Sequence, residues 1–167
     1  MEIETDFLVI GSGIAGLSFA IKMADLGTVA IVTKKEKIES NTNLAQGGIA
    51  AVMDKTDKFE NHINDTLACG AGLTKEDVAK FVVTNAPERI KELVKWGVKF
   101  TKAKKGSSNV YDLGREGGHS RRRILHATDI TGHEVERALI EKASLHKFLC
   151  SYENSLFQQE PSLPHDR

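Results

Sequence analysis

The hydrophobic positions near the start of the chain follow two different spacings. Phe7–Ile10 is a continuous apolar run, typical of a strand buried on both faces in a parallel sheet, and Val29–Thr33 predicts a second buried strand. Between them, apolar residues recur at helical spacing over Ile14–Ala24, and Gly27 follows where a left-handed C-terminal cap is expected. Residues 6–33 therefore predict a strand, a helix and a parallel strand, and with them an α/β fold class.

The rest of the chain predicts a long loop followed by helices. The loop covers Lys34–Asp57 and contains a short extended piece at Ile49–Met53. The expected helices cover residues 61–69, 74–85, 87–97 and 131–143. Beyond them the period is lost and two prolines occur, so we expect residues 1–143 to form the folded portion and residues 144–167 to be a divergent, irregular tail.

Local signals place the ends of these helices. Thr74 and Thr131 each precede an acidic residue by three positions, which is the spacing of a capping box, and Pro87 suits a first helical position. Val98–Phe100 is expected to be a brief strand. Lys102–Asn109 is polar, basic and rich in small residues, which is typical of an exposed turn between two strands.

Composition narrows the class of protein. The 167 residues are 40% hydrophobic and 28% charged, enough for one domain with a core, and 23 basic residues balance 23 acidic ones. This balance gives no reason to expect nucleic acid or an anionic membrane as a partner, and Arg121–Arg123 is too short and too poor in aromatic neighbours to change that. Cys69 and Cys150 are too isolated for a disulfide framework or a metal site, and Met1–Asp6 is acidic where a secretory signal is basic. We therefore expect a soluble cytoplasmic protein without a metal.

A glycine motif stands between the first predicted strand and helix. It has the spacing G-x-G-x-x-G, in the context that the dinucleotide fingerprint requires. Gly11 allows a tight turn, Gly13 lets the backbone approach a pyrophosphate, and Gly16 allows the helix to pack closely on the strand. The candidate cofactor-binding residues here are Gly11, Ser12, Gly13, Ile14, Ala15 and Gly16. The alternative is a tight strand-to-helix turn that binds nothing.

The acidic residue that usually grips a ribose hydroxyl is missing from the end of the second strand. Thr33 and Lys34 stand there instead. Lys34 could accommodate a 2′-phosphate, as in an NADP site, or the adenosine could be held in another way, or the lysine could be no more than a solvated strand end.

The loop after the second strand carries the run NTNLAQGGIA. This run resembles the flavin-facing loop of the succinate dehydrogenase and fumarate reductase flavoproteins and of the L-aspartate oxidases, in the FAD-dependent oxidoreductase 2 family. The resemblance implies a Rossmann-like FAD-binding domain and makes Lys34 and the loop residues FAD contacts, namely Asn41, Thr42, Asn43, Leu44, Ala45, Gln46, Gly47 and Gly48. Paired glycines let backbone lie against a flat ring. Asn41 stands where the membrane-complex members have the histidine that links to flavin, so the resemblance implies noncovalent FAD.

A second run, DLGREGGHSRRRILHA, is similar to the L-aspartate oxidases in particular. The resemblance implies oxidation of L-aspartate to iminoaspartate with oxygen or fumarate as acceptor, in de novo NAD biosynthesis by the quinolinate pathway, with a functional link to quinolinate synthase. It assigns Glu116 to the substrate amine and places the proton-donor arginine outside this chain. From the residues alone, Glu116 could equally be an ion-pair partner of the neighbouring arginines. His119, His126 and His133 could be general bases, but their spacing favours hydrogen-bonded structural roles.

The resemblance covers about residues 6–143, the N-terminal part of a much longer family pattern. The expected domain is therefore incomplete on its C-terminal side, and we expect a truncated or frame-shifted reading frame whose product binds FAD weakly and aggregates. A soluble fumarate reductase with noncovalent FAD, a noncatalytic nucleotide-binding fragment and an NADP-dependent reductase remain as alternatives.

Overall fold

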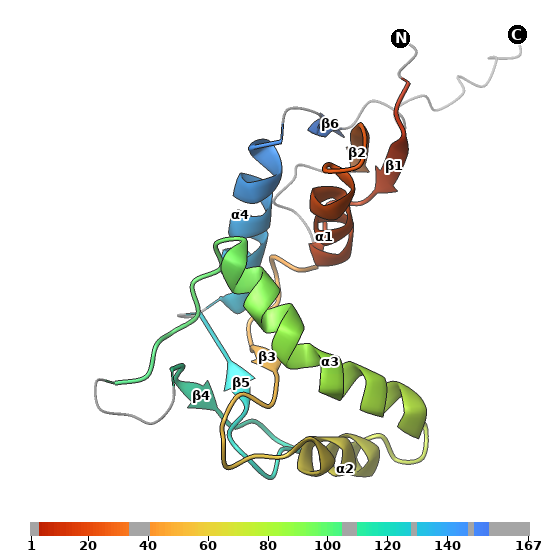
Figure 1. The fold of residues 1–167 in the computed structure, drawn as a ribbon. Coiled ribbons are helices and arrows are strands. Elements are labelled where there is room, and N and C mark those ends of the chain that lie inside the picture. Colours follow the sequence, from red (N-terminus) through yellow and green to blue (C-terminus); the bar gives the residue numbers. More distant parts are fainter. Residues whose placement is uncertain (1–3, 34–40, 105–109, 128–129, 147–148, 154–167) are drawn as a thin grey trace, which may run out of the picture.

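A computed structural model of the chain describes residues 4–33, 41–104, 110–127, 130–146 and 149–153. Figure 1 shows two parts connected by loops: a parallel sheet with two helices, and a second part built on α2, α3 and short strands. Lys34, part of the predicted 102–109 turn and residues 154–167 lie outside the described residues.

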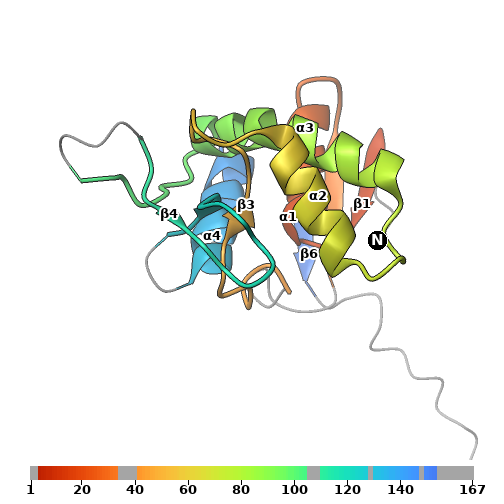
Figure 2. The ribbon, with the colours of Figure 1, turned by 90° about the horizontal axis from the view of Figure 1, so that it is seen from below.

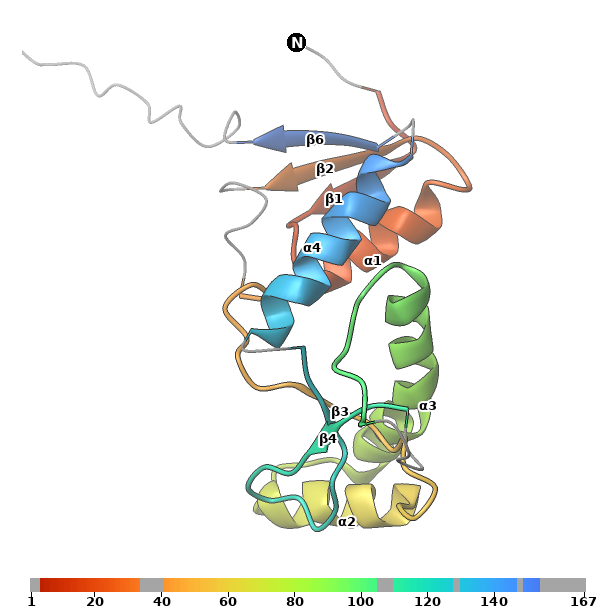
Figure 3. The same ribbon diagram turned by 90° about the vertical axis from the view of Figure 1, so that its left-hand side faces the viewer.

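The parallel sheet contains β1 (Phe7–Ile10), β2 (Val29–Thr33) and β6 (Leu149–Glu153), in the order β1-β2-β6. Helices α1 (Ile14–Met23) and α4 (Thr131–Ser144) lie together on one face of it, as Figure 3 shows. Two crossovers that advance across a sheet in the same direction put their helices on the same face. The predicted strand, helix and parallel strand are confirmed.

Burial of the first strand differs from the prediction. Leu8 is 60% exposed and Ile10 is 81% exposed, whereas Val9 is buried under the helices. The prediction that this strand is buried on both faces is therefore wrong. The physical reason is that both helices cover the same face, and among the described elements none covers the other.

The predicted irregular tail is wrong for residues 149–153. These residues form β6, whose register places Val29 beside Leu149 and Thr33 beside Glu153. A strand added at an edge gains its hydrogen bonds from the neighbouring strand, so hydrophobic periodicity in its own sequence is a poor guide to it.

The second part of the molecule combines a helix pair with a small antiparallel sheet. Helix α2 (Phe59–Cys69) packs against α3 (Glu76–Lys95), as Figure 2 shows from below. The strands are β3 (Ile49–Ala50), β4 (Leu113–Gly114) and β5 (Ile124–Leu125), in the order β3-β5-β4. The extended piece expected at Ile49–Met53 is thus a strand of two residues, and β4 and β5 were not predicted.

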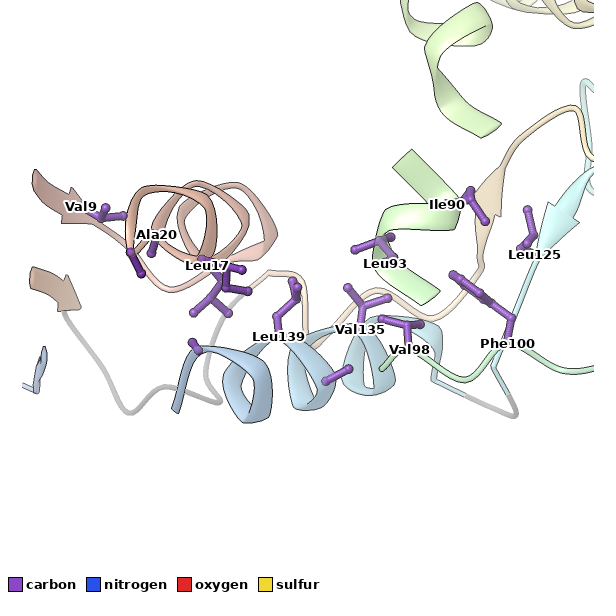
Figure 4. Packing of buried hydrophobic residues seen from close by; sticks show 14 of the residues in the cluster. Val9, Leu17, Ala20, Ile90, Leu93, Val98, Phe100, Leu125, Val135 and Leu139 are labelled. Atoms are coloured by element: carbon purple, nitrogen blue, oxygen red, sulfur yellow. The ribbon is translucent and has the colours of Figure 1, made fainter. Parts of the chain in front are cut away.

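One hydrophobic core runs through both parts. Figure 4 shows it passing from Leu17 of α1 to Leu139 of α4, then to Leu93 of α3 and Leu125 of β5. Trp96 packs against the edge of this cluster, as expected of a core residue at a helix end. Because the two parts share a core, the loops between them are held in fixed places.

Several predicted helix ends are wrong, because tertiary contacts replace the local ones. The two helices expected at 74–85 and 87–97 are one helix, α3 (Glu76–Lys95), with Pro87 inside it, since core packing on both sides outweighs one lost hydrogen bond. The helices begin after Lys75 and Ile130, with no side-chain cap bond, so both capping boxes are wrong. Gly27 is not left-handed; a Cβ there would lie 2.6 Å from an oxygen of Asp6.

The expected strand at Val98–Phe100 is also wrong. Val98 and Phe100 are buried in the core, but the segment makes no ladder with the described strands. Its neighbour Thr101 donates its N–H to the carbonyl of His126, and Lys102 and Tyr111 form an isolated bridge. The apolar segment Val98–Phe100 is therefore buried without pairing as a strand.

Candidate functional site

The glycine motif forms the turn between β1 and α1. Gly11 has φ +103°, a left-handed conformation that favours glycine, and its N–H donates to the carbonyl of Val32 over 2.8 Å. A Cβ on Gly16 would lie 2.2 Å from the carbonyl oxygen of Gly11. The first and third glycines are thus required by the backbone itself, one for the turn and one for the close approach of helix to strand.

The start of α1 faces the predicted flavin loop. The N–H groups at a helix start have no partner within the helix, and here that of Ile14 donates to Thr42 Oγ1 over 3.0 Å. A Cβ on Gly13 would lie 3.4 Å from the same oxygen. Ser12 is buried, with its hydroxyl 3.2 Å from that of Thr33, so its side chain points into the protein.

The loop of residues 41–48 is held by the beginning of α4. Gly132 donates its N–H to the carbonyl of Ala45 over 2.9 Å, and a Cβ on Gly132 would lie 1.7 Å from the carbonyl oxygen of Thr42. Thr131 donates its hydroxyl to the carbonyl of Gly47 over 2.9 Å. Sequence reasoning used Thr131 only as a capping residue and missed this role; the TGH run at a predicted helix start was the available signal.

Two further contacts fix the ends of this loop. His133 Nδ1 lies 2.8 Å from Asn43 Oδ1, and a Cβ on Gly48 would lie 2.3 Å from the carbonyl oxygen of Leu125. The two glycines are therefore adjacent to different groups. Gly48 packs on β5, whereas Gly47 faces the side chain of Glu116.

A cavity of about 310 Å³ lies where the loop, α1 and α4 meet. Its size matches the small end of ligand cavities in proteins. Its walls are mostly apolar, as a flat aromatic ring requires. They are formed by Ile14, Asn41, Thr42, Ala45, Gly48, Ile49, Thr131, Gly132 and Val135. A larger groove of about 560 Å³ lies along α2 and α3, and no predicted site residue lines it. The smaller cavity is therefore the candidate site.

Glu116 is exposed and lies against the loop. A Cβ on Gly47 would be 3.1 Å from Glu116 Oε1 and 3.7 Å from Oε2. Within the described parts of the chain, no ion pair of Glu116 is formed, and the best-buried neighbouring arginine, Arg123, has other partners. The carboxylate is thus presented at the loop surface.

Arg123 is the centre of a buried charge cluster that sequence reasoning missed. Its side chain is fully buried and donates to Asp57 from Nε (2.8 Å) and Nη2 (3.1 Å). Nη1 donates to Asp65 over 2.5 Å and lies 3.2 Å from His119 Nδ1. Burial favours the neutral form of Asp57, but hydrogen bonds from Arg123, Lys58 and Asn61 outweigh it and hold the pKa of Asp57 below its usual value.

The pKa of the second carboxylate in the cluster, Asp65, is shifted more strongly. Burial would raise the pKa of Asp65, yet hydrogen bonds from Ser120 and Arg123 lower it to about 2. Burial also lowers the pKa of His62, and the neighbouring charges of Arg123 and His119 lower it further. The cluster is thus an ionised Asp57–Arg123–Asp65 core next to a neutral imidazole.

The three histidines considered as general bases each have a side-chain neighbour. His119 contacts Arg123, His133 contacts Asn43, and His126 Nε2 lies 3.6 Å from Asp112. These contacts agree with the structural roles that their spacing favoured. The described residues contain no group of three or more His, Cys, Asp or Glu placed to hold a metal ion, and none of the described helices has the length and apolarity to cross a bilayer.

Comparison with known proteins identifies the family to which the chain belongs. A model of the FAD binding domain matches residues 6–159. L-aspartate oxidase 2-a, chloroplastic, of Nicotiana tabacum is 52% identical over 141 residues, which are 84% of this chain and 21% of that protein. L-aspartate oxidase of Yersinia pestis is 47% identical over 143 residues, 85% of this chain and 27% of that protein. The structure of a mutant of E. coli quinol fumarate reductase FrdA superposes with a TM-score of 0.82 at 30% identity, covering 91% of this chain and 26% of that chain. The chain therefore spans about a quarter of the length of the proteins it matches.

Proposed function

Because the chain belongs to the FAD binding domain family, we propose that it is the N-terminal part of the flavin domain of an L-aspartate oxidase. The observation that carries this proposal is that the Glu116 carboxylate faces Gly47, where a Cβ would lie 3.1 Å from Oε1, so the run REGGHS lies beside the loop 41–48. Glu116 and Gly47 lie 69 positions apart in the sequence, and the next residue of the loop, Gly48, lines the cavity. A substrate bound between the loop and Glu116 would touch both segments.

The cofactor is FAD, and the residues present fit it. The turn at Gly11–Gly16 and the start of α1 would hold the pyrophosphate, because the helix end carries partial positive charge and the three glycines of the turn have no side chains of their own. The apolar cavity beside Thr42 and Gly132 would hold the ring. Asn41 has no imidazole for a covalent link, so the proposed FAD is noncovalent. When bound, FAD supplies the acceptance of two electrons from the substrate.

Glu116 provides the charge that an amino acid substrate needs. Its carboxylate accepts hydrogen bonds from the ammonium group of L-aspartate and thereby orients the α-carbon toward the cavity. Charge-assisted hydrogen bonds of this kind are short and directional. The backbone of Gly48 forms part of the cavity wall beside it. The reaction yields iminoaspartate, with oxygen or fumarate as the electron acceptor, and the proton-donor arginine belongs to a part of the family pattern outside this chain.

The wider setting of the reaction is part of the same proposal. Iminoaspartate is consumed by quinolinate synthase on the route to NAD, and both steps belong to the cytoplasm. The resemblance to L-aspartate oxidases supports the reaction step. It does not support the location, since the Nicotiana tabacum relative is named chloroplastic.

A second candidate is a fragment that binds FAD without catalysis. The exposed Leu8 and Ile10 favour it, because an apolar sheet face without a cover weakens a domain that must hold a large cofactor. Measurable affinity for FAD distinguishes both candidates from a domain that binds no ligand.

One titration tests these candidates. The purified chain is titrated with FAD by flavin fluorescence, and the loaded chain is then mixed with L-aspartate without oxygen. Bleaching of the flavin band by L-aspartate and not by D-aspartate supports the oxidase. Reoxidation by fumarate of flavin that dithionite has reduced, without any bleaching of oxidised flavin by L-aspartate, supports a fumarate reductase instead.

Glu116→Gln in the loaded chain is expected to weaken L-aspartate binding about tenfold or more, because a hydrogen bond to a charged group is lost. Glu60→Gln, at an exposed position on α2, serves as the matched control. Binding of FAD without bleaching identifies the fragment, and absence of FAD binding refutes both candidates for this chain.

A further inference from the structure

The turn that carries Glu116 is fastened to α2. Ser120 donates both its backbone N–H and its hydroxyl to Asp65 Oδ2, each over 2.8 Å. Gly118 has φ +81°, and a Cβ there would lie 2.5 Å from Cys69 Sγ. Asp65 and Cys69 lie on the same helix, one turn apart. The turn therefore rests on one short stretch of α2, by a charged hydrogen-bonded pair and a close backbone contact.

Arg123 extends this attachment into the core. Its guanidinium joins Asp65 to Asp57 and reaches His119, whose ring lies 5.4 Å from the ring of His62 on α2. The backbone of Arg123 is itself fixed, since its N–H donates to Gly114 and its carbonyl accepts from Ala51. The cluster thus ties the turn at once to α2 and to the small sheet.

The other end of the turn points at the candidate site. His119 donates its N–H to the carbonyl of Glu116 over 3.3 Å, which closes the turn. The carboxylate of Glu116 then lies against Gly47. A shift of the turn along α2 would carry this carboxylate away from the loop. Among the described residues, no direct side-chain hydrogen bond or ion pair holds Glu116 in place.

We propose that Asp65 and Arg123 are positioning residues for Glu116. They bind neither FAD nor substrate; they hold the Glu116–Ser120 turn so that the carboxylate meets an ammonium group at the loop 41–48. The role of Glu116 toward the amine rests on the proposed function, whereas the position of the turn does not.

Charge explains why these two residues suit the task. A lone buried guanidinium beside the turn would attract the Glu116 carboxylate and hold it away from the substrate. Asp57 and Asp65 together satisfy Arg123, and the side chain of Arg123 is fully buried. Arg123 therefore does not draw the Glu116 carboxylate into an ion pair, and the carboxylate stays available to the ligand.

The first test measures the turn in the chain without FAD. Asp65→Asn is compared with wild type by amide hydrogen exchange at His119, whose N–H closes the turn. We expect exchange to be about tenfold faster or more, because a hydrogen bond to a charged group is worth at least that factor. Glu60→Gln, also on α2, is the matched control. Unchanged exchange at His119 overturns the proposal. Ser120→Ala, an exposed change that removes one of the two bonds, gives the same test with a smaller expected effect if Asp65→Asn does not fold.

The second test separates positioning from general support of the fold. In the loaded chain, Asp65→Asn is expected to leave the Kd for FAD within about twofold and to raise the Kd for L-aspartate about tenfold. An equal loss of both affinities overturns the proposal, because a structural defect affects both ligands. If wild type does not respond to L-aspartate at all, the proposed function fails, and the exchange at His119 decides the positioning of the turn by itself.

Discussion

Replacing Arg123 with methionine is the sharpest test of how the second part of the molecule is held together. Methionine keeps an unbranched side chain but lacks the guanidinium, so the charge is removed. Arg123 is fully buried, and the side chain of its partner Asp57 is 1% exposed, so Arg123→Met leaves a carboxylate in the core without its cation. Asp65 is 17% exposed and can turn to water more easily.

The size of the effect follows from this burial. Removing one partner of a buried ion pair costs about 3–5 kcal/mol, because the charge left behind stays out of water. For a chain of this length, about 1 kcal/mol moves the melting temperature by about 2–4 °C. We therefore expect Arg123→Met to lower the Tm by about 6–20 °C.

The assay is urea and thermal unfolding followed by circular dichroism, with Arg121→Met as the matched control from the same arginine triplet. Arg121 is exposed, so its replacement is expected to change stability by less than about 0.5 kcal/mol. A loss of under about 1 kcal/mol for Arg123→Met would refute the reasoning, since it would mean that Asp57 is solvated or paired elsewhere.

The dependence of stability on pH provides a second check on the same variant. The pKa of Asp65 is about 2 in the folded chain and the ordinary value is 3.8, and the pKa of Asp57 is lowered as well. Carboxyls with depressed pKa stabilise the fold fully above the unfolded value, and this contribution is lost as pH falls through the folded value. Between about pH 5 and about pH 2 the wild type should lose this stability, whereas Arg123→Met should lose much less of it.

Three further changes test other parts of the fold. Gly132→Ala is expected to abolish FAD binding, measured by flavin fluorescence, because its Cβ would lie 1.7 Å from the Thr42 carbonyl oxygen; retained affinity would contradict the packing of loop on α4. Pro87→Ala should raise the free energy of urea unfolding by about 1–3 kcal/mol, since it restores an N–H inside α3, and a lower value would argue against an unbroken helix. Leu8→Thr with Ile10→Thr should reduce light scattering at high protein concentration with little change in Tm; a large fall in Tm would mean that this face is covered.

Local patterns predicted the parts of the fold that local forces decide. The sequence predicted the strands at Phe7–Ile10 and Val29–Thr33 and the helix between them, because apolar runs and helical periods are patterns of neighbouring residues. The glycine motif was informative for the same reason, since the conformation of Gly11 and the close contact of Gly16 arise within one turn.

Predictions failed where a residue had a distant partner. Thr131 was expected to cap its own helix, and it donates instead to the carbonyl of Gly47. Pro87 was expected to begin a helix, and the packing of Val83 and Ile90 in the core carries one helix through it. In each case a tertiary contact supplied more free energy than the local signal.

The candidate site divides in the same way. From the sequence one can predict its parts, namely the turn at Gly11–Gly16, the loop 41–48 and Glu116, because each is a short run of special residues. That these parts meet was decided by the tertiary structure, as were the partners of Arg123, which lie 58 and 66 positions away. A buried charge pairs with the partners that the packed core brings close to it, and these depend on how the two parts of the molecule pack on their shared core.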